Sequence, residues 1–342
     1  MKKLQLINRV NREVLLKKMH TNIEMRTTIS FYKYCSIENP EEFRDTFYLM
    51  LDAINVKGRI YLAQEGINAQ ISVPTFSVEL FRETLNRISF LDNVRLNTAI
   101  EDTNKSFFKL MIKVKEKIVA DGLNDATFNA ADSGMHLDAA GFNALTNKTD
   151  TVLIDMRNHY ESEVGYFEGA IRPDAETFRE EIKIAEKILN GKEDKNIVMY
   201  CTGGIRCEKA SAYFKHKGFK NVFQLDGGII QYTKEARAFN LPNKFRGVNF
   251  VFDERLSERI SDDVVAQCDQ CGAPCDTHKN CVNEACNLLF IQCDTCAAQY
   301  QNTCCLQCAD FIQLPIAEQK ILKKEIGFFG SKLGKGRKVR NM

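Results

Sequence analysis

Two groups of cysteine side chains in this sequence have surroundings that predict two different kinds of chemistry. Ten of the thirteen cysteines lie between residues 268 and 308, whereas another begins the segment Cys201-Thr202-Gly203-Gly204-Ile205-Arg206. A dense group of cysteines in one region is typical of metal ligation. A single cysteine in a glycine-rich loop is typical of a nucleophile.

The loop after Cys201 has the residues that stabilise a thiolate. Residues 197–201 predict a buried strand, and a helix is expected to begin near Ile205. The two glycines allow successive backbone N–H groups to point at the sulfur, while the helix N-terminus and Arg206 add positive charge. The alternative is a buried structural cysteine in an ordinary turn, but glycines, arginine and helix start coincide here. The nearby Cys207 is expected either to resolve an oxidised Cys201 or simply to pack against the sheet.

The cysteine-rich region predicts metal binding. Three pairs have the two-residue spacing that lets both thiolates reach one tetrahedral Zn²⁺. Ten thiols suffice for two structural zinc ions with two left over, and spacing does not reveal which belong together. Free thiols or disulfides, and an iron–sulfur cluster, are the alternatives. The candidate ligands are Cys268, Cys271, Cys275, Cys281, Cys286, Cys293, Cys296, Cys304, Cys305 and Cys308.

The N-terminal part of the chain predicts a ferredoxin-like, or acylphosphatase-like, α+β domain. Strand-like runs at 27–35, 59–63, 67–73 and 110–119 alternate with helical periodicity after Pro40 and from Val78 to Ile88. This strand-helix-strand-strand-helix-strand order is typical of that fold. Four residues on the neighbouring strands, namely Tyr32, Lys33, Arg59 and Tyr61, would give a basic, aromatic sheet face suited to RNA.

Residues 151–240 predict a parallel α/β sheet. Short apolar runs at 151–155, 196–200 and 222–225 are each followed by a helix-compatible segment. Reactive groups gather at the carboxyl ends of such strands, and Asp155, Arg157 and Cys201 all fall there.

Composition and charge narrow the class of protein. A chain of 342 residues predicts two or three domains, and no apolar run approaches the length of a membrane span. Without an apolar export segment at its N-terminus, a cysteine-rich chain is expected in the reducing cytoplasm. The net charge of +2 is uninformative, but eight Lys and Arg residues against two acids follow residue 317. This basic tail would either be solvated or contact nucleic-acid phosphates.

Several motifs together resemble the rhodanese-type tRNA uridine hydroxylases. The loop itself, with residues 154–157, 168–171 and 225–229, is similar to a rhodanese domain. Residues 31–34, 58–70, 200–210 and 271–275 resemble that hydroxylase family in particular, and the likeness runs from about residue 26 to about 320. Two departures are Gly165-Tyr166-Phe167, where parent rhodaneses have Gly-His-Ile, and Asn287, where relatives often have His.

This resemblance implies oxygen-dependent hydroxylation of the wobble uridine in the tRNA anticodon loop to 5-hydroxyuridine. It implies Cys201 as the required cysteine and Asp155 and Arg157 as supports of its loop, with molecular oxygen as co-substrate and structural zinc. Asn68, in the tight connection at 65–69, either makes local hydrogen bonds or, as the resemblance suggests, faces the substrate. No flavin or nicotinamide fingerprint is present, and the sequence does not indicate an oligomeric state.

Two other functions fit parts of the sequence. The loop alone suits a sulfurtransferase that carries a persulfide on Cys201 equally well. A zinc-dependent RNA-binding or scaffold protein without catalysis is the third reading, and the intact Cys201-to-Arg206 loop argues against it. The predicted organisation is a basic leader at 1–25, a ferredoxin-like domain at 26–122, a linker at 123–144, a rhodanese domain at 145–242, a cysteine-rich zinc module at 243–315 and a basic tail at 316–342.

Overall fold

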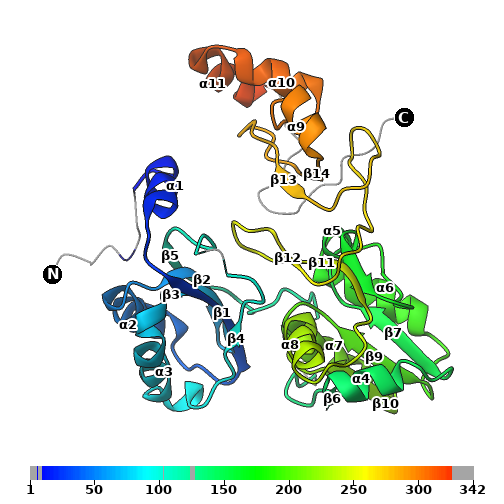
Figure 1. Cartoon of the computed structure of the whole chain (residues 1–342). Coiled ribbons are helices and arrows are strands. Elements are labelled where there is room, and N and C mark those ends of the chain that lie inside the picture. The colour runs from blue at the N-terminus through cyan, green and yellow to red at the C-terminus, as the bar shows by residue number, and fades with distance from the viewer. Residues whose placement is uncertain (1–5, 7–9, 103, 124–127, 326–342) are drawn as a thin grey trace.

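The computed structural model describes residues 6, 10–102, 104–123 and 128–325. Figure 1 shows an N-terminal α+β part beside a central α/β part, with the cysteine-rich part above them. The predicted leader contains helix α1 (Arg12–Thr21), and the predicted tail begins with α11 (Ile316–Glu325). The rest of the basic tail and most of the first nine residues lie outside the described residues. Among the described helices, none is both long and apolar enough to cross a bilayer.

The N-terminal domain has the predicted α+β fold. Its sheet has the order β4-β1-β3-β2-β5, and helices α2 (Pro40–Ala53) and α3 (Val78–Asn86) cover one face. Apolar residues of alternate positions, such as Ile29 and Phe31, fill the core beneath these helices. The strands are β1 (Arg26–Tyr34), β2 (Lys57–Ala63), β3 (Gly66–Pro74), β4 (Asn97–Thr98) and β5 (Leu110–Val114).

One detail of this sheet differs from the sequence pattern. The strand that pairs antiparallel with β1 at one edge is the two-residue β4, whereas β5 pairs parallel with β2 at the other edge. A two-residue strand has no apolar alternation, so the sequence pattern assigns the last strand of the fold only to 110–119. The pairing partners of a strand depend on contacts far along the chain, which periodicity does not report.

The central domain has the predicted parallel sheet, in the order β6-β10-β9-β7, in which the edge strand β6 comprises Met135–Leu137. Alternate side chains of β9 point to opposite faces, so Ile197 and Met199 pack under α6 and α7, and Val198 and Tyr200 pack under α4 and α8. The elements are α4 (Ala139–Leu145), β7 (Thr151–Asp155), α5 (His159–Ser162), α6 (Phe178–Leu189), β9 (Asn196–Tyr200), α7 (Ile205–His216), β10 (Asn221–Leu225) and α8 (Gly228–Ala238).

The segment 123–144, for which the sequence predicts a linker, contains part of this domain. Strand β6 (Met135–Leu137) pairs parallel with β10, and α4 packs on the sheet. Met135 and His136 are exposed, so this short edge strand lacks the apolar run that identifies a buried strand.

The C-terminal part is joined to the central domain by backbone hydrogen bonds between strands. Strand β11 (Phe245–Phe250) pairs antiparallel with β8 (Gly165–Phe167) and with β12 (Ser257–Arg259). The cysteine-rich module then comprises a small hairpin and short helices, namely β13 (His278–Asn280), β14 (Leu289–Ile291), α9 (Asp294–Gln299) and α10 (Leu306–Gln313).

Candidate functional site

Cys201 lies directly after β9, in a loop that directs a backbone N–H group at its sulfur. The N–H of Gly204 donates to Cys201 Sγ over 3.1 Å, and α7 begins at the next residue. Gly204 adopts a φ of 99°, which L side chains rarely adopt. The glycine therefore permits the turn that aligns the helix N-terminus with the thiol.

The charges around Cys201 favour its thiolate. Burial opposes ionisation, but a hydrogen bond from Cys207, the guanidinium of Arg206 and nearby backbone N–H groups outweigh it and lower the pKa of Cys201 from 9.0 to about 6. Burial and the neighbouring Cys201 sulfur instead raise the pKa of Cys207. Of these two buried thiols, Cys201 is therefore the one that ionises near neutral pH.

Arg206 is held by a buried carboxylate that sequence inspection did not single out. Its Nη1 and Nη2 atoms donate to Glu161 Oε1 and Oε2 over 2.6 and 2.8 Å. Glu161 has no exposed surface, and it lies on α5, far from the loop in sequence. No local pattern predicts such a long-range partner, although a buried arginine beside a thiol requires a counter-charge.

Asp155 and Arg157 form a buried pair beneath the site. Arg157 Nη2 donates to Asp155 Oδ2 over 2.7 Å and to the carbonyl oxygen of Gly165 over the same distance. Neither side chain lines the cavity at Cys201. Their contacts connect β7 with β8, so their position is consistent with a supporting role.

A cavity of about 510 Å³ lies between the N-terminal sheet, the Cys201 loop and residues 251–258. Of the residues predicted for the site, Cys201, Thr202, Gly203, Ile205, Arg206 and Asn68 line this cavity. Arg59, Tyr61 and Tyr32 from the predicted sheet face line it as well. Lys33 does not, because adjacent residues of a strand point to opposite faces, and its ammonium contacts the carbonyl oxygen of Asp92.

Four contacts fix the N-terminal domain against helix α7. Tyr32 Oη donates to Glu208 Oε1 over 3.0 Å, and Tyr34 Oη donates to the carbonyl oxygen of Ile205 over 3.1 Å. Lys209, which is 1% exposed, bridges Glu65 and Asp121 at 2.8 and 2.6 Å. The N-terminal domain thus closes the cavity over the Cys201 loop.

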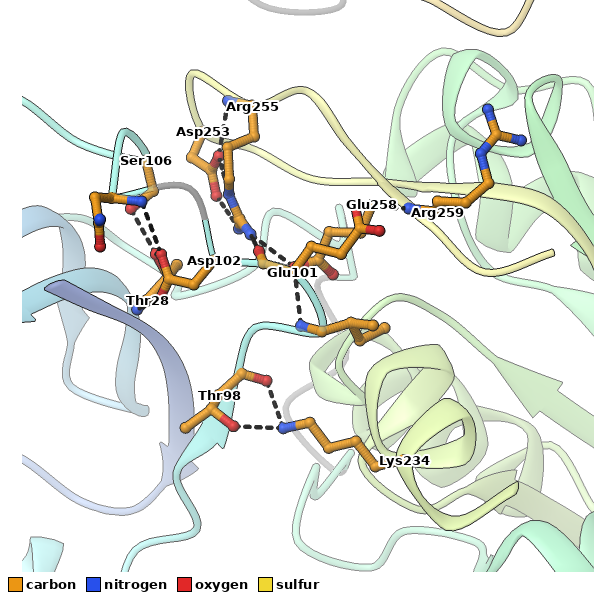
Figure 2. A network of polar contacts seen from close by, with 12 residues as sticks. Thr28, Thr98, Glu101, Asp102, Ser106, Lys234, Asp253, Arg255, Glu258 and Arg259 are labelled. Carbon is orange, nitrogen blue, oxygen red and sulfur yellow. Dashed lines mark hydrogen bonds and ion pairs between the residues drawn. The ribbon is translucent and has the colours of Figure 1, made fainter. Parts of the chain in front are cut away.

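A second set of polar contacts holds the far wall of the cavity (Figure 2). Arg255 donates to Glu258 over 2.7 Å, and Glu258 accepts from the backbone N–H of Ile100 over 3.1 Å. Lys234 on α8 donates to the carbonyl oxygen of Thr98. These contacts join the loop after β4 to the segment that leads into β12 and to the central domain.

Glu181 on α6 is another buried group that sequence inspection did not single out. Neither carboxyl oxygen has a hydrogen-bond partner among the described residues. Burial, together with the negative charges of Asp155 and Glu161, raises the pKa of Glu181 to about 10. The side chain is therefore a neutral acid at physiological pH.

Eight of the ten candidate metal-binding cysteines form two groups of four. Within each group all sulfur atoms lie within 4.8 Å of one another. A tetrahedral zinc–thiolate centre with Zn–S bonds of about 2.3 Å places its sulfurs about 3.8 Å apart. The separations are 3.7 Å for Cys271 and Cys293 and 3.8 Å for Cys304 and Cys308, so the residues fit the metal. The groups are Cys268, Cys271, Cys293 and Cys296, and Cys281, Cys286, Cys304 and Cys308, while Cys275 and Cys305 lie outside both.

The fold and the site define a class of protein, a rhodanese-fold protein whose Cys201 loop is covered by an acylphosphatase-like domain. Three family models match the chain, namely the UPF0176 acylphosphatase like domain at residues 26–118, the rhodanese-like domain at 138–235 and the rhodanase C-terminal at 246–309.

Whole-chain similarity gives the family. A protein of Pectobacterium carotovorum named tRNA uridine(34) hydroxylase is 56% identical over 92% of this chain and 89% of its own length. A protein of the same name from Enterobacter is 52% identical over 96% of this chain and 97% of its own length. The rhodanese-like domain of an Anabaena protein, a solved structure, is 17% identical over 33% of this chain and 78% of its own, with a TM-score of 0.27. The chain belongs to the tRNA uridine(34) hydroxylase family.

Proposed function

We propose that this protein adds a hydroxyl group to C5 of the wobble uridine of tRNA, with molecular oxygen as co-substrate and Cys201 as nucleophile. The observation that carries the proposal is the position of a thiol of lowered pKa at the wall of a cavity roomy enough for a nucleotide base. The name of the relatives, which match this chain along nearly all of its length, supports this substrate.

Cys201 would act by addition to the uracil ring. Its thiolate forms a bond to C6, and the electron pair of the C5–C6 double bond moves toward C5 and the O4 carbonyl. C5 thereby becomes electron-rich and can react with oxygen. The N–H of Gly204 and the guanidinium of Arg206 would hold the sulfur as an anion until the base arrives.

The overall reaction balances with a reductant from outside the chain. One oxygen atom bonds to C5, and the other leaves as water after uptake of two electrons and two protons. Loss of the C5 proton and cleavage of the C6–S bond then restore the double bond and the free thiolate. Cys201 is regenerated, so the protein is a catalyst and not a reagent.

The substrate would be bound with its wobble base out of the stack. A base of the anticodon loop is not paired in a duplex, so its displacement costs little. The cavity opens between two domains, which leaves the remainder of the anticodon loop outside. The protein would act in the cytoplasm, where its tRNA substrate is found.

The other predicted residues have supporting roles in this proposal. Asp155 and Arg157 would hold β7 and β8 beneath the loop. Each group of four cysteines would hold one zinc ion, which supplies the folding energy that the small apolar core of the C-terminal module does not. Zinc is thus assigned a structural role, remote from the uracil chemistry.

Sulfur transfer from a persulfide on Cys201 is the alternative reaction. The rhodanese loop alone suits both reactions. Two observations favour hydroxylation. The relatives that match nearly the whole chain are named as hydroxylases, and an N-terminal domain lies over the Cys201 loop.

Nucleoside mass spectrometry of tRNA tests the proposal. A strain that lacks this protein should lose 5-hydroxyuridine and its derivatives, and wild-type protein should restore them whereas Cys201→Ala should not. Unchanged 5-hydroxyuridine together with reduced 2-thiouridine would instead assign sulfur transfer to the loop.

A further inference from the structure

The cavity wall opposite Cys201 is a sheet face whose residues are held in two rows. On β1, β3 and β2 the alternate residues that point away from the apolar core line the cavity. The strand register places Asn68 directly between Tyr32 and Tyr61, and places Gln70 between Ser30 and Arg59. Neighbouring strands lie about 4.8 Å apart, so each row spans about 10 Å. That span is the size of one nucleotide.

The first row leads to the Cys201 loop. A Cβ placed on Gly204 would lie 2.7 Å from Tyr32 Oη, so the end of this row contacts the loop directly. A base that lies against Asn68 would therefore lie between the sheet and the Cys201 loop. The two tyrosine rings beside Asn68 offer aromatic surface for contact with the base.

The Asn68 amide retains hydrogen-bonding capacity that matches uracil. Its Nδ2 donates to the carbonyl oxygen of Ile118, and its Oδ1 accepts from Gln70, both over a long 3.4 Å. An amide has two N–H groups and two oxygen lone pairs, so one of each remains. This pair is complementary to the O4 acceptor and the N3–H donor of uracil, but not to cytosine, which has a donor and an acceptor in the opposite places.

The second row ends in a guanidinium without a counter-charge. Two other arginines line the cavity, but Arg206 pairs with Glu161, and Arg255 pairs with Asp253 and Glu258. The Arg59 side chain makes no hydrogen bond or ion pair with any residue that the structure describes, although the backbone of Arg59 pairs within the sheet. A half-buried, unpaired guanidinium beside a base-sized surface is suited to a phosphate group, which it can bind with two parallel hydrogen bonds.

We propose that these two rows form a uridine-nucleotide subsite, in which Asn68 reads the uracil edge, Tyr61 packs on the base and Arg59 binds an adjacent phosphate. This inference rests on the proposed function, and it assigns substrate choice to the N-terminal domain while the central domain supplies the nucleophile. The domain would thus be a specificity element and not only a cover.

Binding of synthetic anticodon stem-loops, measured without oxygen so that no turnover occurs, tests the subsite. Three RNAs that differ only at the wobble position would be compared, carrying uridine, cytidine or an abasic sugar. The wild-type protein should bind the uridine RNA at least about tenfold more tightly than the other two, as one well-formed hydrogen-bonded contact permits. Equal affinity for all three RNAs would overturn the proposal.

The variants separate the three roles. Arg59→Gln should weaken binding of all three RNAs by a similar factor, roughly tenfold, and Arg59→Lys should recover part of it. Asn68→Asp should remove the preference for uridine over cytidine, because a carboxylate accepts from cytosine N4 but cannot donate to uracil O4. Tyr61→Ala should weaken the uridine and cytidine complexes but not the abasic one.

Arg87→Gln is the matched control, because Arg87 is exposed at the end of α3, on the helix-covered face of the same sheet. It should bind as wild type does. An unchanged affinity in Arg59→Gln, or an unchanged ratio of uridine to cytidine affinity in Asn68→Asp, would contradict the subsite. Because no turnover is measured, these results stand apart from the hydroxylation test, and either proposal can fail alone.

Discussion

At Cys201, burial and local positive charge have opposite effects on the pKa of the thiol. Burial alone would raise its pKa, as it does for Cys207 six residues later. The guanidinium of Arg206 and the directed N–H groups reverse the sign for Cys201. The sequence alone predicts that this thiol is the nucleophile, because all of these groups lie within one short segment.

The pH dependence of turnover should report this thiol. The thiolate is the reactive form, so kcat/KM should fall about tenfold per pH unit below the pKa of Cys201 and level off above it. With the pKa lowered to about 6, the midpoint of the acid limb should lie near pH 6. Steady-state kinetics with an anticodon stem-loop between pH 5 and pH 9 measures it. A midpoint near the ordinary thiol value of 9.0 would contradict the proposed environment of Cys201.

At the scale of elements, the loop between β9 and α7 depends on one of its two adjacent glycines. Gly204 has a φ of 99° and lies against Tyr32, whereas nothing lies within 4 Å of a Cβ placed on Gly203, whose φ is not positive. The sequence motif presents the two glycines as equivalent. Only the backbone conformation and the neighbouring domain distinguish them.

Gly204→Ala should therefore be far more damaging than Gly203→Ala. The first substitution strains the backbone by about 1–3 kcal/mol, and its methyl group clashes with Tyr32 Oη. The resulting shift of the loop displaces the backbone N–H that contacts Cys201. The expected result is a loss of kcat of at least about a hundredfold together with a raised thiol pKa. Thiol alkylation rates as a function of pH, with Gly203→Ala as the control, provide the measurement. Equal effects of the two substitutions would argue against this geometry.

The cysteine-rich module shows the same limit of sequence reasoning. Spacing predicts metal ligation but not the grouping, because the two groups alternate along the chain, so that Cys268 lies with Cys296 and not with the nearer Cys281. Folding of the hairpin β13–β14 and of α9 brings them together. The leftover Cys275 and Cys305 are distinguishable only in three dimensions.

The wild-type protein should contain two zinc ions per chain by native mass spectrometry, one for each group of four cysteines. Cys281→Ser and Cys268→Ser should each reduce the metal content by one, and the apo module should lose its protection from proteases. Cys275→Ser and Cys305→Ser are the matched controls, and both should retain the full content. Loss of metal in either control would show that the ligand sets are drawn wrongly.

At the scale of the whole molecule, the candidate site lies where the domains meet, because its cavity is lined by residues of both. The sequence indicated the domains and their folds, but the contact of Tyr32 with Glu208 joins residues 176 positions apart, and that of Ile100 with Glu258 joins residues 158 positions apart (Figure 2). No local pattern carries such information. Only the structure therefore reveals that the sheet face of the N-terminal domain lies across the cavity from the Cys201 thiol.

Lys209 tests whether this arrangement of domains is needed. Lys209→Met removes the buried ammonium between Glu65 and Asp121, although Asp121 keeps its contact with Lys117. The free energy of unfolding should fall by about 3 kcal/mol, as expected when a buried ion pair is broken. Urea denaturation measures the loss, and activity should fall with it. Lys220→Met, at an exposed pair with Asp194, should leave both unchanged; an equally small effect of Lys209→Met would contradict the role assigned to the contact.

The origin of the added atom is the most direct test of the central claim. Cells that lack the native protein and carry either the wild type or Cys201→Ala would be exposed to oxygen gas enriched in the heavy isotope. The isotope distinguishes a hydroxyl oxygen that comes from molecular oxygen from one that comes from water. We predict heavy oxygen in the 5-hydroxyuridine of the wobble position with wild type and none with Cys201→Ala. A wobble nucleoside that gains sulfur, or a hydroxyl group without the heavy isotope, would contradict the account.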